Sequence, residues 1–209
     1  MKLTILGGTG GVGRHLVTMA VEAGHEVTAF ARNPRQLPCR EQLRVVEGEL
    51  PDREGLGAAV DGADAVLSAV GARSNTPDQV EVFATAMQDL VEVMAELGVR
   101  RLVAISGAGV LVPGDHVTLG RRFVRLMLRL FAKHVAAAKE QEYRVIAASP
   151  LDWVLVRPPR IVPGPSTGEY RVLADRVPSP KISQGDVAHL MLECVRGDEW
   201  VRRAPIPGY

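Results

Sequence analysis

Short apolar runs alternate along the chain with longer segments in which apolar residues recur every three or four positions. A short run that is nearly all apolar is typical of a strand buried on both faces, and the longer period is typical of a helix with one buried face. The apolar runs predict strands at Lys2–Leu6, Glu26–Ala31, Leu43–Val46, Ala65–Val70, Arg101–Ser106 and Trp153–Arg157.

The segments between these runs predict helices, and residues that commonly flank helices support their ends. Gly24 and Gly98 follow two of them, as glycine often does where a helix ends in a left-handed residue. Ser183 or Asp186 can cap the start of the last one. The predicted helices are Gly13–Ala23, Arg53–Val60, Asp78–Leu97, Gln184–Arg196 and a long helical region, Arg121–Ala148, with a break expected near Ser149-Pro150.

The order of these elements predicts the fold class. Strands that alternate with helices form crossover units, which build a mainly parallel sheet with helices on both faces. No internal repeat divides the chain, and Pro163–Pro180, rich in glycine, proline and serine, is typical of a loop or small hairpin over a site rather than a linker. We therefore expect one doubly wound α/β domain over residues 1–209, with residues 160–182 as a substrate-side loop region.

Composition and charge exclude several classes of protein. The 209 residues are 46% hydrophobic and 23% charged, which excludes a disordered chain, and the net charge of +1 gives no general attraction to nucleic acid. Cys39 and Cys194 are too few for a disulfide-stapled secreted protein, and no metal-binding motif is present. The first apolar run is too short for a signal peptide and no run could span a membrane, so we expect a cytoplasmic protein.

Glycines cluster between the first predicted strand and the first predicted helix, over Gly7–Gly13. Their spacing fits both GxxGxxG and GxGxxG. Dinucleotide binding needs such glycines for a tight turn, for close approach of the backbone to a pyrophosphate, and for packing of the helix on the strand. Because a strand precedes the motif and an amphipathic helix follows it, we interpret it as a Rossmann-like cofactor site rather than as a flexible turn without a ligand.

The end of the second predicted strand indicates which nucleotide binds. A protein specific for NAD usually has an aspartate or glutamate there, which holds the ribose 2′-hydroxyl. This chain has Arg32, followed by Arg35. Guanidinium groups pair well with a 2′-phosphate, so we predict NADP(H) as the cofactor; the alternative is that both arginines are only solvated.

These segments and several later ones resemble a known family. The chain is similar, over essentially its whole length, to the atypical short-chain dehydrogenases/reductases of the NAD(P)H-binding, NmrA-like group. Within that group it most resembles the flavin reductases, also called biliverdin IXβ reductases. The matching segments are Gly7–Gly13, Ala31–Pro38, Val70–Arg73, Ile105–Ala108, Val156–Pro159 and Ile182–Ala188.

The resemblance implies a single domain that binds NADPH, and it implies a role for each matching segment. The glycine loop would line the pyrophosphate, the arginines would meet the 2′-phosphate, and the segments after the later strands would flank the nicotinamide. The implied cofactor-binding residues are Gly7, Thr9, Gly10, Gly11, Val12, Gly13, Arg32, Arg35, Val70, Gly71, Arg73, Ser106, Pro158, Pro159 and Ile161.

Two departures from the family pattern concern the chemistry. Ordinary enzymes of the superfamily use a Tyr-xxx-Lys pair as proton donor, but no tyrosine here has a lysine four residues on, and Lys139 precedes Tyr143 in the reverse order. Close relatives have a histidine after the Pro-Pro pair, where this chain has Arg160.

Ser106 and Arg160 are the candidate catalytic residues. Ser106 can donate a hydrogen bond to the substrate or the nicotinamide, or it only satisfies backbone groups at the strand end. Arg160 can bind a substrate carboxylate or phosphate, or it points to water.

A cationic row lies in the predicted helical region 121–133. Arg121, Arg125, Arg129 and Lys133 recur every four residues in a stretch that is otherwise strongly apolar. We favour a solvated face on a core helix. The alternatives are a membrane surface or an anionic partner for the cations, and a second subunit or the substrate site for the apolar residues.

Together these features predict an NADPH-dependent reductase that transfers hydride to a flat conjugated small molecule, such as a flavin, a quinone or a linear tetrapyrrole. The cofactor carries the hydride, and such acceptors can take a proton from solvent, which suits a chain without the Tyr–Lys pair. The alternatives are a non-catalytic NADP(H)-binding sensor and, more weakly, a nucleotide-sugar epimerase or dehydratase. We expect a monomer or a homodimer without a nucleic-acid partner.

Overall fold

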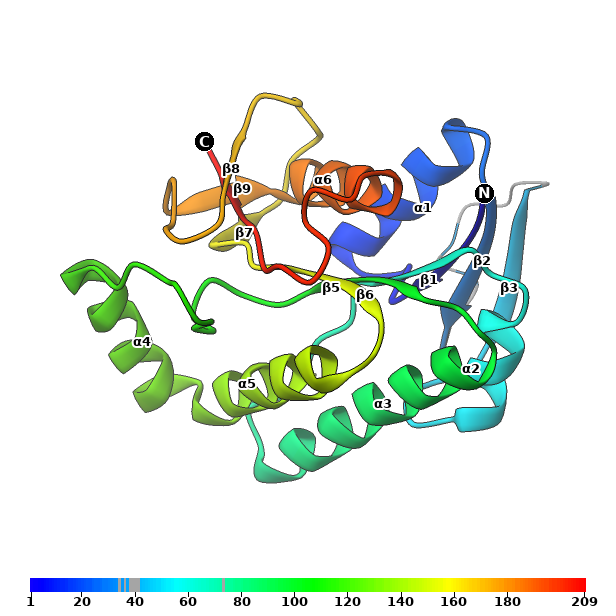
Figure 1. Cartoon of the computed structure of the whole chain (residues 1–209), viewed down its shortest axis with the longest axis horizontal. Coiled ribbons are helices and arrows are strands. Elements are labelled where there is room, and N and C mark those ends of the chain that lie inside the picture. The colour runs from blue at the N-terminus through cyan, green and yellow to red at the C-terminus, as the bar shows by residue number, and fades with distance from the viewer. Residues whose placement is uncertain (34, 36, 38–41, 73) are drawn as a thin grey trace.

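Six parallel strands form the central sheet, in the order β3–β2–β1–β4–β5–β6 (Figure 1). The structure, a computed structural model, describes residues 1–33, 35, 37, 42–72 and 74–209. The strand order reverses between β1 and β4, as in doubly wound α/β folds, and the predicted fold class is confirmed. The strands are β1 Lys2–Leu6, β2 Glu26–Ala31, β3 Leu43–Glu47, β4 Ala65–Ser68, β5 Arg101–Ile105 and β6 Asp152–Val156.

The first strand shows why the sheet sequences are almost entirely apolar. Leu3 and Ile5 lie in the core on one face of the sheet and Leu6 lies in the core on the other, because alternate side chains of a strand point to opposite faces. The register places Leu6 beside Phe30 of β2 and Ser68 of β4. These three strands therefore end level with one another, and the loops that follow them share one edge of the sheet.

Helices cover both faces of the sheet. Figure 1 shows α1 and α6 on one side of it and α2, α3 and α5 on the other, and each group packs on its own apolar core. Ser183 caps α6, since its side chain accepts a hydrogen bond from the Asp186 N–H, as predicted. The helices are α1 Gly11–Glu22, α2 Arg53–Val60, α3 Pro77–Glu96, α4 Leu119–Phe131, α5 Lys133–Ala148 and α6 Gln184–Arg196.

The long helical region predicted at Arg121–Ala148 is two helices, α4 and α5, so this prediction is wrong in its interior. Ala132, with φ −140° and ψ 40°, lies outside the helical conformation and separates them. Asn75 holds the break from the loop before α3: its amide NH₂ donates to Phe131 O at 2.9 Å, and its Oδ1 accepts from His134 N at 2.9 Å. One side chain therefore satisfies backbone groups at the end of one helix and the start of the next.

Four short strands lie outside the main sheet, within and after the predicted loop region 160–182. β7 (Arg160–Val162) pairs in parallel with β9 (Lys181–Ser183). β8 (Arg171–Leu173) pairs with β10 (Ile206–Gly208) near the end of the chain, so the segment 163–180 is a loop with a strand paired elsewhere and not a hairpin.

Asp186 fixes this loop to the start of α6. Its buried carboxylate accepts hydrogen bonds from Thr167 N at 2.7 Å, Gly168 N at 3.0 Å and the Tyr209 hydroxyl at 2.8 Å. Burial by itself would raise the pKa of this carboxyl, but the hydrogen bonds outweigh it and lower the pKa to about 2. A Cβ at Gly185 would lie 2.1 Å from Ser166 N, which shows how closely the loop backbone lies on the helix.

We expect Asp186 to make the stability of the fold depend on pH in acid. Because its pKa is lower in the folded state, its contribution is complete above about pH 4 and is lost as the pH falls from about 4 to about 2. Asp186→Asn should lower the free energy of unfolding at neutral pH by roughly 2 kcal/mol and flatten its dependence on pH in that range. Urea unfolding over a pH series measures both effects. Asp175→Asn, at a half-exposed carboxylate of the same loop, is the control, and equal flattening there would contradict this assignment.

Candidate active site

The glycine loop turns at the point where the strand order reverses. Gly7 has φ +78°, and a Cβ there would lie 2.9 Å from Ala69 O in the loop after β4. A Cβ at Gly13 would lie 2.0 Å from Gly7 O, so α1 packs directly on the turn. Gly10 N donates to Gly7 O at 3.0 Å and closes the turn. The loop therefore needs glycine at 7 and 13 for the steric reasons that dinucleotide binding demands.

The start of α1 offers backbone N–H groups to an anion. Gly10 is the N-cap residue, and the helix has no side-chain cap and no acidic residue in its first turn. The N–H groups of Gly11, Val12 and Gly13 therefore lack intrahelical acceptors, and the helix dipole favours negative charge beside them. The Val12 side chain itself is buried in the core beneath the loop.

A cavity of about 230 Å³ opens beside this loop at the carboxyl ends of the strands. It joins the glycine loop to the ends of β2 and β4 and to α3, so most of the predicted cofactor residues of the first half of the chain meet there. Arg32 is exposed at its edge, and Arg35 is exposed but does not line it. Arg73 lies outside the described residues. The lining residues that were predicted are Gly7, Thr9, Gly10, Arg32, Val70 and Gly71.

A second cavity, of about 210 Å³, lies beyond the carboxyl end of β5. Its lining comes from the loop after β5 and from α4 and α5, and it is mainly apolar. Ser106 lines it, as do Leu128 and Lys139. Lys139 connects the two cavities, because its ammonium donates to Val70 O, in the lining of the first, at 3.2 Å.

Behind Ser106 a partly buried lysine pairs with a fully buried carboxylate. Lys139 Nζ donates to Ile105 O at 2.8 Å and lies 3.1 Å from both Glu142 carboxylate oxygens. Glu142 is fully buried, and burial raises its pKa while the Lys139 charge opposes the rise. The nearby Ser106 hydroxyl also favours the charged form, but no described group has hydrogen-bond geometry toward this buried hydroxyl. Ser106 lines the second cavity, and its contact with a ligand there stays a prediction.

Sequence reasoning set Lys139 aside because it precedes Tyr143 rather than following it. The structure places Lys139 in the candidate site, whereas the Tyr143 ring packs edge-on against Trp153 with centroids 6.3 Å apart. The sequence signal for this pair was the spacing of three residues between Lys139 and Glu142, which places both on one helix face. In the structure that face is turned toward the end of β5.

The segment after β6 runs beside the loop of Ser106. Ser106 N donates to Val156 O at 2.8 Å and Ala108 N donates to Pro158 O at 2.9 Å. Pro159 and Ile161 are partly buried, and Arg160 is exposed at the start of β7. Of these residues, Pro158–Ile161 line neither cavity, and their contact with a cofactor or substrate stays a prediction.

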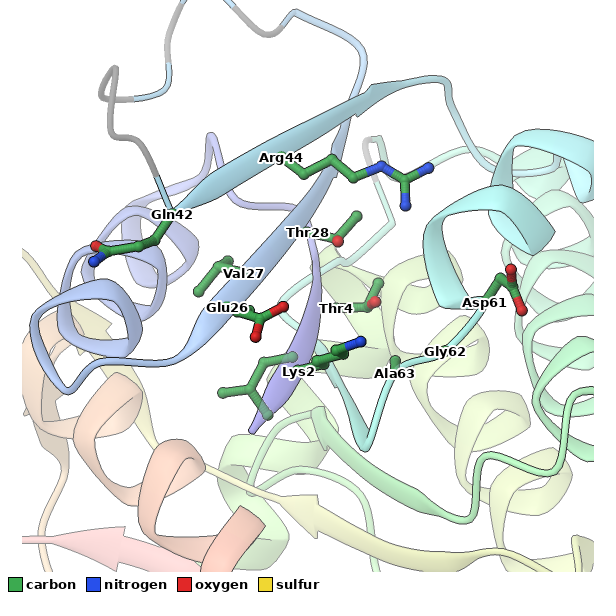
Figure 2. Close-up of a pocket in the computed structure, with 11 residues that line it drawn as sticks. Lys2, Thr4, Glu26, Val27, Thr28, Gln42, Arg44, Asp61, Gly62 and Ala63 are labelled. Atoms are coloured by element: carbon green, nitrogen blue, oxygen red, sulfur yellow. The ribbon is translucent and has the colours of Figure 1, made fainter.

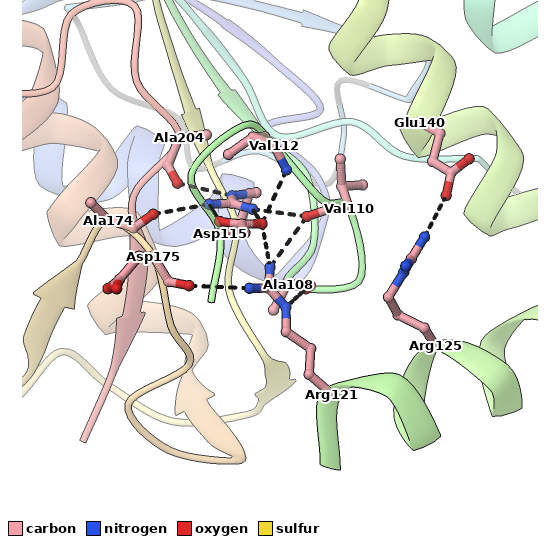
Figure 3. Close-up of polar contacts among 11 residues, drawn as sticks. Ala108, Val110, Val112, Asp115, Arg121, Arg125, Glu140, Ala174, Asp175 and Ala204 are labelled. Carbon is pink, nitrogen blue, oxygen red and sulfur yellow. Dashed lines mark hydrogen bonds and ion pairs between the residues drawn. The ribbon is translucent and has the colours of Figure 1, made fainter. Parts of the chain in front are cut away.

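An ion cluster fixes the loop between β5 and α4 (Figure 3). The buried Asp115 carboxylate accepts from Arg157 Nη1 at 2.6 Å and Nη2 at 2.9 Å, and from Arg121 Nη2 at 2.8 Å. Burial would raise the pKa of Asp115, but the two guanidinium groups hold it below its usual value. Arg121 is therefore buried and does not belong to a solvated cationic row, which corrects the prediction for that residue.

A further cavity, of about 300 Å³, lies at the opposite edge of the sheet (Figure 2). Its lining includes Lys2, Glu26 and Arg44, near the amino ends of β1, β2 and β3. Ligands of open α/β sheets bind at the carboxyl ends, so this cavity is not the candidate site. Among the described residues no helix is both long and apolar enough to cross a bilayer, and no three side chains gather as metal ligands.

Comparison with known proteins also indicates binding of NAD(P)H. A family model described as NAD(P)H-binding matches residues 7–198. The chain is 31% identical over 213 residues to a 3-diazoavenalumate denitrifying reductase of a Streptomyces species, across 92% of this chain and 69% of that reductase. It is 32% identical over 129 residues, or 57% of its length, to a 3 beta-hydroxysteroid dehydrogenase/Delta 5-->4-isomerase of Mycobacterium tuberculosis. That alignment spans 35% of the dehydrogenase, so the chain matches about a third of this relative's length.

Two solved structures share the fold. A short-chain dehydrogenase/reductase from Veillonella parvula DSM 2008 in complex with NADP has a TM-score of 0.83 at 17% identity, over 100% of this chain and 94% of that one. An anaerobillin reductase from Escherichia coli O157:H7 has a TM-score of 0.80 at 16% identity, over 99% and 96% of the two chains. At these identities the likeness extends to the fold alone.

Proposed function

The chain belongs to the NAD(P)H-binding family, and from this premise we propose that it is an NADPH-dependent reductase of a flat conjugated acceptor, such as a flavin, a quinone or a linear tetrapyrrole. The observation that carries the proposal is the junction at Lys139. This residue connects a cavity built on the glycine loop with a mainly apolar cavity that holds the buried Ser106 hydroxyl.

Features of the first cavity support a dinucleotide site there. The glycine loop leaves no room for a Cβ at Gly7 or Gly13, and the start of α1 presents backbone N–H groups without a side-chain cap. Arg32 at the edge of the cavity can pair with a 2′-phosphate, and Arg35 would be the second cation. Glu49 lines the same cavity, and a carboxylate is the group that holds the ribose 2′-hydroxyl in proteins specific for NAD. Cofactor choice is therefore tested by comparing the binding of NADPH with that of NADH. When bound, the nucleotide supplies the hydride.

Features of the second cavity support an acceptor site there. Its mainly apolar lining can hold a flat ring system, and the Ser106 hydroxyl can donate a hydrogen bond to a polar atom of that ring. A reduced acceptor also needs a proton. Lys139 lines the cavity and would donate one from Nζ, while the buried Glu142 carboxylate holds this nitrogen in place.

The test of the function is NADPH oxidation by the purified protein with riboflavin, FMN, a soluble quinone and biliverdin as acceptors. Turnover above the rate in free solution with at least one of them supports the proposal. Binding of NADP(H) without turnover of any acceptor would favour the non-catalytic sensor instead, and absence of nucleotide binding would reject both.

We expect the second cavity to control turnover rather than cofactor affinity. Lys139→Met should lower kcat about 100-fold by removing a proton donor, and Ser106→Ala should lower it about 10-fold by removing one hydrogen bond. The Kd for NADPH should change little in either variant. Tyr143→Phe, on the same helix but packed on Trp153, is the matched control. If Lys139→Met kept full turnover with a pH profile like the parent's, the proton-donor role would be wrong.

A further inference from the structure

The helix α4 exposes its apolar side chains to solvent, which no core helix does. Leu119 is 82% exposed, Phe123 62% and Leu130 62%, and Leu126 and Phe131 are exposed as well. The buried side chain among its described residues is instead that of Arg121. The favoured interpretation of this region as a core helix with a solvated charged face is therefore wrong.

The exposed apolar residues form one stripe along the helix. Leu119, Phe123, Leu126 and Leu130 follow one another at intervals of four, three and four residues, which places them on one face. Arg121 is held on the opposite side by the Asp115 cluster, so the stripe faces away from the protein. Figure 1 shows α4 at the edge of the molecule with α5 as its neighbour.

Cations flank this stripe. Arg122, Arg129 and Lys133 are exposed, and Arg125 lies 3.5 Å from Glu140. No aspartate or glutamate occurs between residues 116 and 139. An occupant of this face must therefore be anionic and must also accept large apolar side chains. A second copy of the chain meets only the second demand, because a two-fold contact between two α4 helices would oppose cation to cation.

From this face we propose that α4 docks the protein on an anionic lipid surface, with its axis in the membrane plane. Leucine and phenylalanine would enter the boundary between headgroups and acyl chains, and arginine and lysine would pair with lipid phosphates. The helix is already formed: Thr118 caps its start, and Asn75 bonds the carbonyl at its end. Docking would therefore cost little ordering of the chain. Leu128 lines the second cavity from the opposite side of α4, so docking would leave the helix between that cavity and the lipid.

Vesicle sedimentation of the full chain tests the proposal. We expect binding to vesicles of phosphatidylcholine with phosphatidylglycerol, little binding to phosphatidylcholine alone, and weaker binding at high salt. The double variants Phe123→Ser with Leu126→Ser and Arg122→Gln with Arg129→Gln should each reduce the bound fraction about tenfold or more. Leu97→Ser and Arg44→Gln change exposed residues of the same kinds elsewhere and should bind as the parent does.

Circular dichroism confirms that each variant is folded. Equal binding by the parent and both double variants would overturn the proposal, as would absence of binding to the anionic vesicles. Light scattering, which measures the oligomeric state, tests the alternative that a second copy of the chain covers the stripe. A stable dimer that dissociates in the Phe123→Ser, Leu126→Ser variant would assign the stripe to an interface between copies of the chain.

Discussion

Replacement of Asp115 by alanine is expected to lower the free energy of unfolding by about 3–5 kcal/mol, because it leaves two buried guanidinium groups without their anion. Arg157 is fully buried and Arg121 is nearly so. Arg157 also donates to Ala204 O at 2.9 Å, and Arg121 donates to Ala108 O at 3.2 Å. These bonds link the loop after β5 to the end of the chain, so the uncompensated charges would loosen several segments together.

Urea unfolding followed by circular dichroism measures the loss of stability. Urea is used because guanidinium chloride is a salt and would screen the charges under test. Asp115→Asn keeps an acceptor oxygen for the arginines and should lose less stability than Asp115→Ala. It also gives a measurable value if the alanine variant does not fold. Asp198→Ala, which removes the exposed partner of Arg101, is the control and should shift the midpoint little. A loss for Asp115→Asn no larger than that of the control would mean that the cluster does not stabilise the fold.

The sheet and the glycine loop could be predicted because their causes are local in sequence. A strand buried on both faces must be apolar, and this located the central strands of the main sheet, whereas the edge strand β3 is largely exposed and was found from a shorter apolar run. The glycine loop can be predicted from the sequence too, because the positive φ of Gly7 and the close packing at Gly13 exclude other residues there. The same reasoning gave the ends of most helices to within a few residues.

The features that sequence reasoning missed depend on contacts between distant residues. Asn75, in the loop before α3, bonds the backbone where α4 ends, and neither Phe131 nor His134 carries a local signal for that break. The apolar period of α4 correctly predicts a helix with one apolar face, but periodicity does not say which way that face points. The pairing of Arg121 with Asp115 decides it, by turning the arginine inward and the leucines outward.

The candidate site also combines a part that is determined locally in the sequence with a part that depends on contacts between distant residues. The cofactor side follows from a short motif, whereas the acceptor side is assembled from the end of β5, from α4 and from α5. Lys139 and Glu142 acquire their environment only when α5 packs over Ile105 and Val70. A charged pair at this spacing is common on exposed helices, and burial is what gives this pair chemical meaning.

Charge reversal at Arg32 should weaken NADPH binding by roughly 30- to 150-fold, or about 2–3 kcal/mol, the scale of a charge-assisted contact replaced by repulsion. Arg32 lies at the edge of the cavity that holds Gly7 and Gly10, where the end of β2 would reach the adenosine side of the proposed dinucleotide. NADH lacks the 2′-phosphate, so Arg32→Asp should change its affinity little. Calorimetry with both nucleotides measures the difference, and Arg35→Asp tests the second proposed contact in the same way.

Arg44→Asp separates a local contact from a general change of charge. It makes the same reversal at an exposed arginine that lines the cavity on the opposite edge of the sheet (Figure 2), so it alters net charge equally without touching the nucleotide site. NADPH affinity should therefore stay near that of the parent. Equal losses of affinity for NADPH and NADH in Arg32→Asp would show that this arginine does not recognise the phosphate. A loss of NADPH affinity in Arg44→Asp as large as that in Arg32→Asp would assign the effect to long-range electrostatics, which salt would screen.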